Sequence, residues 1–591
     1  MTAAYLDAAA PIEERIDDLL ARMTLEEKAG QLFHTMVLVG PGGTLTGPVD
    51  ALGLPSPQDM VHGRHITHFN MVGSASAQDM ARWHNRLQDL TETTRLRIPI
   101  VLATDPRHSF TRNVGTGDAT TAFSTWPEPI GLAAIGEPAL VEQFADACRQ
   151  EYLAVGLRVA LHPQLDLATE PRWARIAGTF GEDADLTGRL GAAYIRGFRG
   201  NALGADSVAT MIKHFPGGGP LRDGEDSHFP TGKAQVYPGG WFERHLAPFR
   251  AALDAGATQV MPSYGIPLGV GVEEVACGFN RDLIAGLLRT VLGFDGIVCT
   301  DWGLITDVVL LGQVMPARAW GVEHLSREQR VLLALEAGVD QFGGEHCPEI
   351  VVDLVRSGAL SEARVDESVR RVLRDTFALG LFERRHVDVD HAIRTAGHAT
   401  LRAAGRTAQS RSVTVLANTG PAGAPTLPLA RGCRLYAAGL DPAVASRYAT
   451  VVDDASAADV AVMRLRAPFE PRPGRFESMF HQGSLEFPDD TVGAVHALTA
   501  TVPTVLAVFL DRPAVLTGLV DDAAAVVVDY GCSDEALLDV LFGLVQPAGR
   551  LPFDLPRSMA AVEASRTDVA FDTADPLFRF GHGLEIGERT T

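Results

Sequence analysis

Short apolar runs rich in β-branched residues alternate with helical stretches through the first 385 residues of the chain. The runs cover residues 98–104, 157–161, 208–212, 258–261 and 297–300, and the helical stretches cover 140–152, 185–197, 241–255 and 281–292. Repeated strand and helix units predict a parallel sheet, because parallel neighbours need a crossover between them. Since about 350 residues follow this pattern, we expect an α/β fold in which residues 1–385 form a TIM-like (β/α)8 barrel.

The pattern changes at residues 386–410, where we place a linker that ends in a helix. Beyond it, short strands are predicted at 413–416, 435–438, 460–465, 505–509 and 525–528. A turn or a helix follows each of them, and none is joined to the next by a two-residue hairpin turn. We therefore expect residues 411–591 to form a doubly wound α/β sandwich domain with a parallel sheet of about five or six strands.

The charge balance excludes several classes of partner. The chain has 51 Lys and Arg against 73 Asp and Glu, and its net charge of −22 repels the phosphates that a nucleic-acid-binding protein must neutralise. Its apolar runs are shorter than the ~18 residues that span a bilayer. We therefore expect neither nucleic acid nor a membrane among the partners.

The cysteines and the N-terminus predict a reducing compartment. The six cysteines are Cys148, Cys277, Cys299, Cys347, Cys433 and Cys532. They include no CxxC pair, so they predict buried thiols and neither a zinc site nor a disulfide framework. The first 20 residues lack the basic and then apolar regions of a secretory signal. We therefore expect a cytoplasmic protein.

Polar side chains follow four of the apolar runs, at the point where each strand is predicted to end. They are Asp105, Lys213 with His214, Ser263 with Tyr264, and Asp301. In a (β/α)8 barrel the active site forms at the carboxyl ends of the strands. An acid at such a place is often only a helix cap, but four clusters in one array favour a sugar or phosphate site.

Seven motifs occur along the chain in a fixed order. They are LLARMTLEEKAGQ at 19–31, ATEPRWAR at 168–175, GTFGED at 178–183, KHFPG at 213–217, GFDGIVCTDWG at 293–303, AGRLPF at 548–553 and FGHGL at 580–584. In this order they resemble glycoside hydrolase family 3, and the resemblance covers nearly the whole chain. It implies that an N-terminal barrel and an α/β sandwich share one active site.

The resemblance implies a role for Asp301, which stands where the family carries its catalytic nucleophile. A retaining glycosidase needs an ionised carboxylate there, because it forms a covalent glycosyl-enzyme intermediate. By the same resemblance, the residues that line the pocket for the terminal sugar are Asp105, Arg172, Lys213, His214, Tyr264 and Trp302. Asp105 departs from the family pattern, because Pro106 follows it where many members have a His-Gly pair.

The general acid/base is the least constrained of the site residues. In this family it usually comes from a loop of the second domain, and Glu470, the first acid after a predicted strand, is preferred there over Glu477. The N-acetylglucosaminidase branch of the family instead uses an Asp-His pair in a barrel loop, which Asp226 and His228 resemble. Against that alternative, Gly218 replaces the expected His.

Together these features predict a retaining exo-acting β-glycosidase, with β-glucosidase as the first choice and a small carbohydrate as its partner. No metal or organic cofactor is expected. Two alternatives stay open at this point: a β-N-acetylhexosaminidase that uses Asp226 and His228, and a non-catalytic sugar-binding protein on the same fold. The sequence does not exclude a homo-oligomer.

Overall fold

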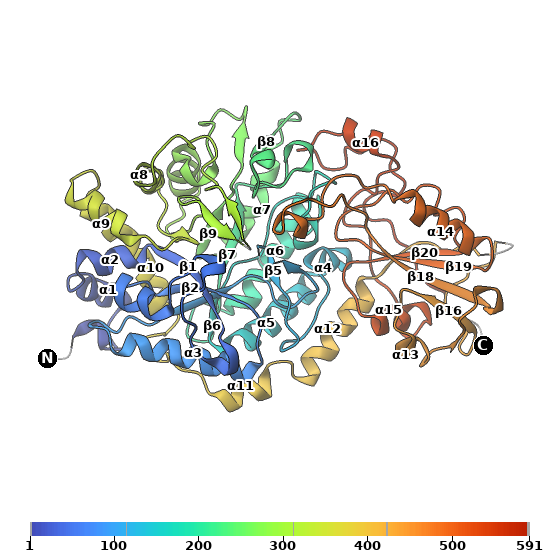
Figure 1. The fold of residues 1–591 in the computed structure, drawn as a ribbon, viewed down its shortest axis with the longest axis horizontal. Coiled ribbons are helices and arrows are strands. Elements are labelled where there is room, and N and C mark those ends of the chain that lie inside the picture. Colours follow the sequence, from blue (N-terminus) through green and yellow to red (C-terminus); the bar gives the residue numbers. More distant parts are fainter. Residues whose placement is uncertain (1–2, 114, 311, 421–422, 588–591) are drawn as a thin grey trace.

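Eight parallel strands form a barrel in the first part of the computed structural model, which describes residues 3–113, 115–310, 312–420 and 423–587 (Figure 1). In order around the barrel they are β1 (Phe33–Leu38), β2 (His68–Val72), β3 (Val101–Thr104), β6 (Leu157–Ala160), β7 (Ala209–Phe215), β9 (Gln259–Pro262), β11 (Ile297–Val298) and β14 (Phe342–Gly343). A parallel bridge between Cys299 and Gln341, next to β11 and β14, closes the ring. The predicted (β/α)8 barrel is confirmed.

Five of these strands, β3, β6, β7, β9 and β11, lie where the apolar runs predict them. The sequence does not predict β1, β2 or β14. Buried polar side chains, among them His34, His68 and Asn70, interrupt the apolar pattern of β1 and β2. β14 has only two residues, too few to show a pattern.

Helices follow the strands on the outside of the barrel. They are α3 (Ala77–Glu92), α4 (Pro129–Ile135), α5 (Pro138–Val155), α6 (Ala184–Arg199), α7 (Phe242–Asp254), a helix at Asp282–Val291, α8 (Arg327–Ala337), α9 (Pro348–Arg356) and α10 (Glu362–Ala378). Ahead of β1 lie α1 (Ile12–Leu20) and α2 (Leu25–Gln31). The loops add the strand pairs β4 (Arg112–Asn113) with β5 (Gly117–Asp118), β8 (Ala234–Val236) with β10 (Ile266–Leu268), and β12 (Val308–Leu310) with β13 (Gln313–Met315).

The second domain contains a six-stranded sheet within its described residues. Its spatial order is β15 (Thr414–Ala417), β20 (Ala525–Asp529), β19 (Thr504–Phe509), β18 (Val460–Arg466), β16 (Arg434–Ala438) and β17 (Thr450–Val451). Its helices are α13 (Pro442–Ala445), α14 (Asp489–Thr499), α15 (Asp534–Leu541) and α16 (Met559–Ala564). One feature of the prediction is wrong: β15 runs antiparallel to β20, so the sheet is mixed and not wholly parallel.

The segment predicted as a linker, residues 386–410, is largely helical. It carries α11 (Val389–Thr395) and most of α12 (Ala399–Ser412). α11 packs against α3 and α5 of the barrel, whereas α12 packs against α4 and against α15 of the second domain (Figure 1). The segment therefore connects the domains as a packed element, while the domain boundary itself stays a prediction.

The two domains share an apolar core. Trp173, Ile176 and Leu221 from barrel loops pack in one cluster with Leu506 and Phe553 from the second domain. Because apolar area is removed from water on both sides, this contact stabilises one relative placement of the domains. The barrel loops and the second domain therefore form a continuous surface at the carboxyl ends of the strands.

Buried Arg512 fastens a loop of the second domain beside this core. Its guanidinium donates hydrogen bonds to the backbone carbonyl of Arg172 in the barrel and to those of Pro468, Gln482, Gly483 and Ser484. Hydrogen bonds from a charged donor are worth about 1.5–3 kcal/mol each when their partners are buried. The loop that follows β18 is thereby held against the barrel.

Glu182, in the barrel, makes a second polar contact across the interface. Its carboxyl accepts hydrogen bonds from the backbone N–H groups of Asp554, at 2.6 Å, and Phe571, at 2.8 Å. Burial raises the pKa of Glu182 to about 8, although both backbone donors favour the ionised form. The neutral carboxyl is therefore the form that the folded interface prefers near neutral pH.

The raised pKa makes stability depend on pH in a defined window and direction. Between about pH 4.5 and 8 the folded chain keeps a proton on Glu182 that the unfolded chain has lost, so raising the pH lowers the free energy of unfolding by up to about 1.4 kcal/mol per pH unit. In Glu182→Gln this contribution disappears. We therefore expect its thermal unfolding midpoint, measured from pH 5 to 8, to fall less steeply than that of the unsubstituted protein.

The matched control is Glu585→Gln, which changes a side chain that is 88% exposed. It should leave the pH dependence as it was. Equal slopes for the unsubstituted protein and Glu182→Gln would show that Glu182 does not titrate in this window.

Among the described residues, no helix combines the length and the apolar character needed to cross a membrane. The thiols of Cys148, Cys277, Cys299, Cys347 and Cys532 are buried, and Cys433 is half-buried.

Candidate active site

Asp301 follows β11 and lies in a cavity of about 290 Å³ at the carboxyl ends of the barrel strands. The side chain is only 7% exposed. Its Oδ1 accepts a hydrogen bond from the backbone N–H of Trp302 at 2.8 Å. Within the described part of the chain, Oδ2 accepts no hydrogen bond, and it lies 3.7 Å from Nε2 of His214. One carboxylate oxygen is therefore anchored while the other is left without a donor.

A charged pair lies in the same cavity. Nζ of Lys213, in β7, is 2.9 Å from Oδ1 of Asp105, which follows β3. Asn70, in β2, donates its side-chain N–H to Oδ2 of Asp105 at 3.2 Å. Carboxylate, ammonium and amide groups at the ends of three strands can bind vicinal hydroxyls with charge-assisted hydrogen bonds.

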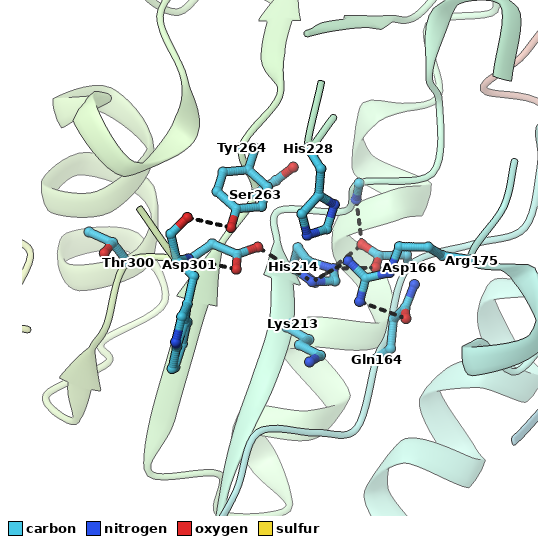
Figure 2. Close-up of polar contacts among 12 residues, drawn as sticks. Gln164, Asp166, Arg175, Lys213, His214, His228, Ser263, Tyr264, Thr300 and Asp301 are labelled. Atoms are coloured by element: carbon cyan, nitrogen blue, oxygen red, sulfur yellow. Dashed lines mark hydrogen bonds and ion pairs between the residues drawn. The ribbon is translucent and has the colours of Figure 1, made fainter. Parts of the chain in front are cut away.

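His214 is held between a carboxylate and a guanidinium. Its Nδ1 is 2.7 Å from Oδ2 of Asp166, and Nη1 of Arg175 donates to its Nε2 at 3.1 Å (Figure 2). Because Nε2 accepts a hydrogen bond, the ring proton belongs on Nδ1. Burial and the charge of Arg175 lower the pKa of His214, although Asp166 opposes this. The imidazole is therefore neutral at neutral pH.

His228 also lines this cavity, together with Asp301. Its Nδ1 is 2.6 Å from Oδ1 of Asp226, and Trp173 donates its indole N–H to the other oxygen of Asp226 at 2.9 Å. Burial raises the pKa of Asp226, but the charge and the hydrogen bond of His228 outweigh it and hold that pKa well below its usual range. An ionised Asp226 accepts the Nδ1 proton of the imidazole and thereby fixes the orientation of the ring.

The ring of His228 is enclosed on several sides. Tyr264 lies 4.9 Å away between ring centroids, Phe480 5.0 Å and Phe476 6.0 Å. The backbone carbonyl of His228 accepts a hydrogen bond from Arg318 at 3.4 Å. Of the described residues, none forms a hydrogen bond to Nε2, so this nitrogen is available on the cavity side. Figure 2 shows His228, Tyr264 and Asp301 around one space.

The second domain contributes to this pair through Gln482. Its side-chain oxygen accepts a hydrogen bond from the backbone N–H of Asp226 at 3.3 Å. Gln482 is buried, and its own carbonyl is one of those held by Arg512. The loop of the second domain thus supports the barrel loop that carries Asp226 and His228.

Tyr264 and Trp302 lie beside Asp301, as the sequence predicts. The Tyr264 hydroxyl donates to the backbone carbonyl of Trp302 at 2.7 Å. The indole of Trp302 packs on Gly343 and Gly344, where a Cβ would come within 2.7 and 2.8 Å of ring atoms. Only residues without a side chain leave room for the indole at these two positions, so the local sequence fixes where Trp302 lies.

The placement of Arg172 differs from the prediction. Its Nε and Nη2 donate to both carboxylate oxygens of Glu170, at 2.8 and 2.9 Å, and the residue does not line the cavity around Asp301. Arg175, three residues later in the same motif, lies there instead. The loop after β6 turns between the two arginines, and motif matching alone cannot show which of them points inward.

The placement of Glu470 and Glu477 also differs from the prediction. Glu470 is exposed, with its carboxyl against Gly483, and Glu477 opens a short 3-10 turn at the molecular surface. Neither side chain lines the cavity that holds Asp301, whereas His228 does. Glu470 pairs with Gln482 through their backbones, and its carboxyl lies against Gly483 of its own loop.

Sequence reasoning missed several residues of the site. They are Asn70, Asp166, Arg175, Arg318 and Gln482. Asp166 lies five residues after the end of the apolar run 157–161, and Arg175 stands in the ATEPRWAR motif. No local pattern marks Asn70, Arg318 or Gln482, because tertiary packing alone brings the first two to the cavity and Gln482 to the backbone of Asp226.

Two family models match the chain. The model described as "Glycosyl hydrolase family 3 N terminal domain" matches residues 24–374, and the one described as "Glycosyl hydrolase family 3 C-terminal domain" matches residues 308–586.

Curated proteins match it over nearly the full length. A probable beta-glucosidase C of Aspergillus flavus is 51% identical over 582 residues, covering 98% of this chain and 91% of the relative. A periplasmic beta-glucosidase/beta-xylosidase of Dickeya chrysanthemi is 41% identical over 604 residues, covering 98% and 91%. The cytoplasmic location expected from the N-terminus stays a prediction.

Solved structures share the fold. A beta-glucosidase from Listeria innocua in complex with isofagomine superposes with a TM-score of 0.77 at 22% identity, covering 97% of this chain and 83% of that one. A mutant exo-1,3/1,4-beta-glucanase from a Pseudoalteromonas species has a TM-score of 0.77 at 22% identity, covering 98% and 97%. At this level of identity, the likeness concerns the two-domain architecture alone.

Proposed function

The chain belongs to glycosyl hydrolase family 3, and from that premise we propose that it is a retaining exo-acting β-glucosidase that releases the terminal sugar of β-glucosides. Asp301 is the nucleophile, and His228, oriented by Asp226, is the general acid/base. The observation that carries the proposal is the one cavity into which both Asp301 and His228 point. The relatives of about half-identical sequence that are named β-glucosidases support the choice of sugar.

In the first step, Oδ2 of Asp301 attacks the anomeric carbon while the bond to the leaving oxygen breaks. The protonated imidazole of His228 gives its Nε2 proton to that oxygen, so the leaving group departs as an alcohol. The sugar stays behind as a covalent ester of Asp301. The lack of a hydrogen bond at Oδ2 suits this role, because no hydrogen bond has to be broken before this oxygen attacks.

In the second step, neutral His228 takes a proton from a water molecule that attacks the anomeric carbon, and the ester bond to Asp301 breaks. The charge and the hydrogen bond of protonated His228 hold the pKa of Asp226 low. When the imidazole is neutral, its Nδ1–H and the indole N–H of Trp173 still donate to the carboxylate of Asp226. Its negative charge stabilises the imidazolium whenever the proton is on His228. The pair therefore acts twice per turnover: as acid it gives a proton to the leaving group, and as base it regains a proton from the attacking water.

The cavity explains an exo mode of action. The Lys213–Asp105 pair and Arg175 line it together with Asp301, offering charged partners for the hydroxyls of a single sugar. Its volume of about 290 Å³ suits one sugar ring and part of a leaving group. A chain of sugars can enter only by its end.

The Asp226–His228 pair also favours a second candidate, a β-N-acetylhexosaminidase, because that branch uses such a pair. An aryl-glycoside panel of glucoside, xyloside, arabinoside and N-acetylglucosaminide distinguishes the two. Hydrolysis of the N-acetylglucosaminide with none of the glucoside would select the second candidate. A non-catalytic sugar-binding protein would turn over none of them.

Removing the nucleophile should abolish turnover without unfolding the protein. We expect Asp301→Asn to lower kcat on an aryl β-glucoside by roughly 10⁴-fold or more, with an unchanged thermal unfolding midpoint, because the side chain makes one backbone contact and no packing core. Asp89→Asn, on the exposed face of α3, is the control and should keep full activity. Near-normal turnover by Asp301→Asn would end the glycosidase proposal.

The loss of activity on removing the acid/base should depend on the leaving group of the substrate. In His228→Ala, kcat/KM on an alkyl glucoside should fall by about 10²–10⁴-fold, the usual contribution of general acid catalysis. A dinitrophenyl glucoside needs no protonation, so its first step should be spared. Azide should then restore turnover and yield a β-glucosyl azide, because an anion needs no general base.

The control for this experiment is Glu470→Ala, which should behave like the unsubstituted enzyme with every leaving group. A leaving-group dependence and azide rescue in Glu470→Ala, with neither in His228→Ala, would show that Glu470 of the second domain is the general acid/base.

A further inference from the structure

The cavity around Asp301 has two chemically different parts. Its inner part carries the ionic groups Asp105, Lys213, Arg175 and Asp301. Its outer part is carbon-lined by a group that we call the apolar rim: Leu52, Leu54, Val308, Leu310 and Phe476. A sugar in the inner part would therefore leave its leaving group among apolar side chains.

Three separate segments build the apolar rim. Leu52 ends a short 3-10 turn at Asp50–Leu52, and β12, which carries Val308 and Leu310, packs directly on that turn. Phe476 comes from the loop of the second domain that follows β18. Since apolar residues from three distant parts of the chain meet at the mouth of one cavity, the rim is a property of the tertiary fold.

Packing accounts for Leu54 and Phe476, which are buried, but not for the rest of the rim. The β12–β13 hairpin exposes carbon to water: Val309 is 46% exposed, while Val308, Leu310 and Leu52 are only half-buried. Exposed apolar side chains gathered around a cavity are typical of ligand-binding surfaces, because folding gains little from them.

Two of the polar groups near the rim are engaged, whereas Oγ1 of Thr306 has no hydrogen-bond partner among the described residues. His346 contacts the carbonyl of Gly53 at 3.1 Å through Nε2, and Asp307 accepts the backbone N–H of Ala317 at 2.8 Å. A second sugar in the outer part would place hydroxyls against carbon, and a hydroxyl that loses water without gaining a partner costs free energy. An alkyl or aryl group makes no hydrogen bonds with water, so it has none to lose on entering the outer part of the cavity.

We propose that the apolar rim is a leaving-group site for apolar aglycones, so that the preferred substrates are β-glucosides of hydrophobic alcohols and not oligosaccharides. The inference rests on the proposed glycosidase function. It assigns the choice of leaving group to Leu52, Leu54, Val308, Leu310 and Phe476, while the inner part selects the sugar.

A series of alkyl β-glucosides tests this directly. Methyl, butyl, hexyl and octyl β-glucosides share one sugar and nearly the same leaving-group reactivity, so released glucose reports how the enzyme treats chain length. We expect kcat/KM to rise up to about three- to four-fold for each methylene that enters the rim, then to level off. Cellobiose, with a sugar as its leaving group, should fall below hexyl β-glucoside.

Variants tie the effect to the rim. Val308→Thr keeps the side-chain shape but adds a hydroxyl, and Leu52→Gln changes a second segment, so the test does not depend on the hairpin alone. Each should lower the octyl-to-methyl ratio of kcat/KM several-fold, with methyl β-glucoside as the reference substrate in each variant. The matched control is Val314→Thr, on β13 of the same hairpin, 69% exposed and outside the cavity lining.

A flat series, or a preference for cellobiose over hexyl β-glucoside, would overturn the inference while methyl β-glucoside hydrolysis upheld the glycosidase function. If the octyl-to-methyl ratio of kcat/KM were equal in all three variants and the unsubstituted enzyme, the aglycone would bind elsewhere than at the apolar rim. Release of glucose from none of the substrates would overturn the proposed function itself, and the inference with it.

Discussion

The candidate active site depends on one constraint: closing parallel strands into a barrel brings their carboxyl ends to the same end of the ring. Asn70, Asp105, Lys213 and Asp301 are far apart in sequence, yet each lies in or directly after a barrel strand. The bridge between Cys299 and Gln341 completes the ring next to Asp301. Without closure, the strand carrying the carboxylate would lie at a sheet edge, away from the strands β2 and β3.

Burial of the charged side chains of the site costs free energy unless each has a partner that offsets its charge. Asp166 is paired with His214, Asp226 with His228, and Lys213 with Asp105. The exception is Oδ2 of Asp301, for which the described residues provide no hydrogen bond. Its neighbour His214 is kept neutral by burial and by Arg175, so it offers little compensating charge. This uneven distribution of partners supports the proposal that Asp301 is the reactive carboxylate.

The sequence predicted features that local patterns encode and missed those set by tertiary packing. Five barrel strands and the position of Asp301 follow from apolar runs and short motifs. The pattern did not separate Arg172 from Arg175, because both stand in one loop and only its turn decides which faces the cavity. Likewise, β15 reads as an ordinary strand, and nothing in its residues indicates that it pairs antiparallel.

The same distinction explains the changed role of the second domain. An acid after β18 is a reasonable expectation, but in the loop that Arg512 holds, Gln482 and Phe476 contact the barrel, whereas Glu470 is exposed. Gln482 supports the backbone of Asp226, and Phe476 packs beside His228. Under the proposed mechanism, the second domain donates no proton but still helps to keep the geometry of the buried Asp-His pair, because it supplies a hydrogen bond and an apolar wall.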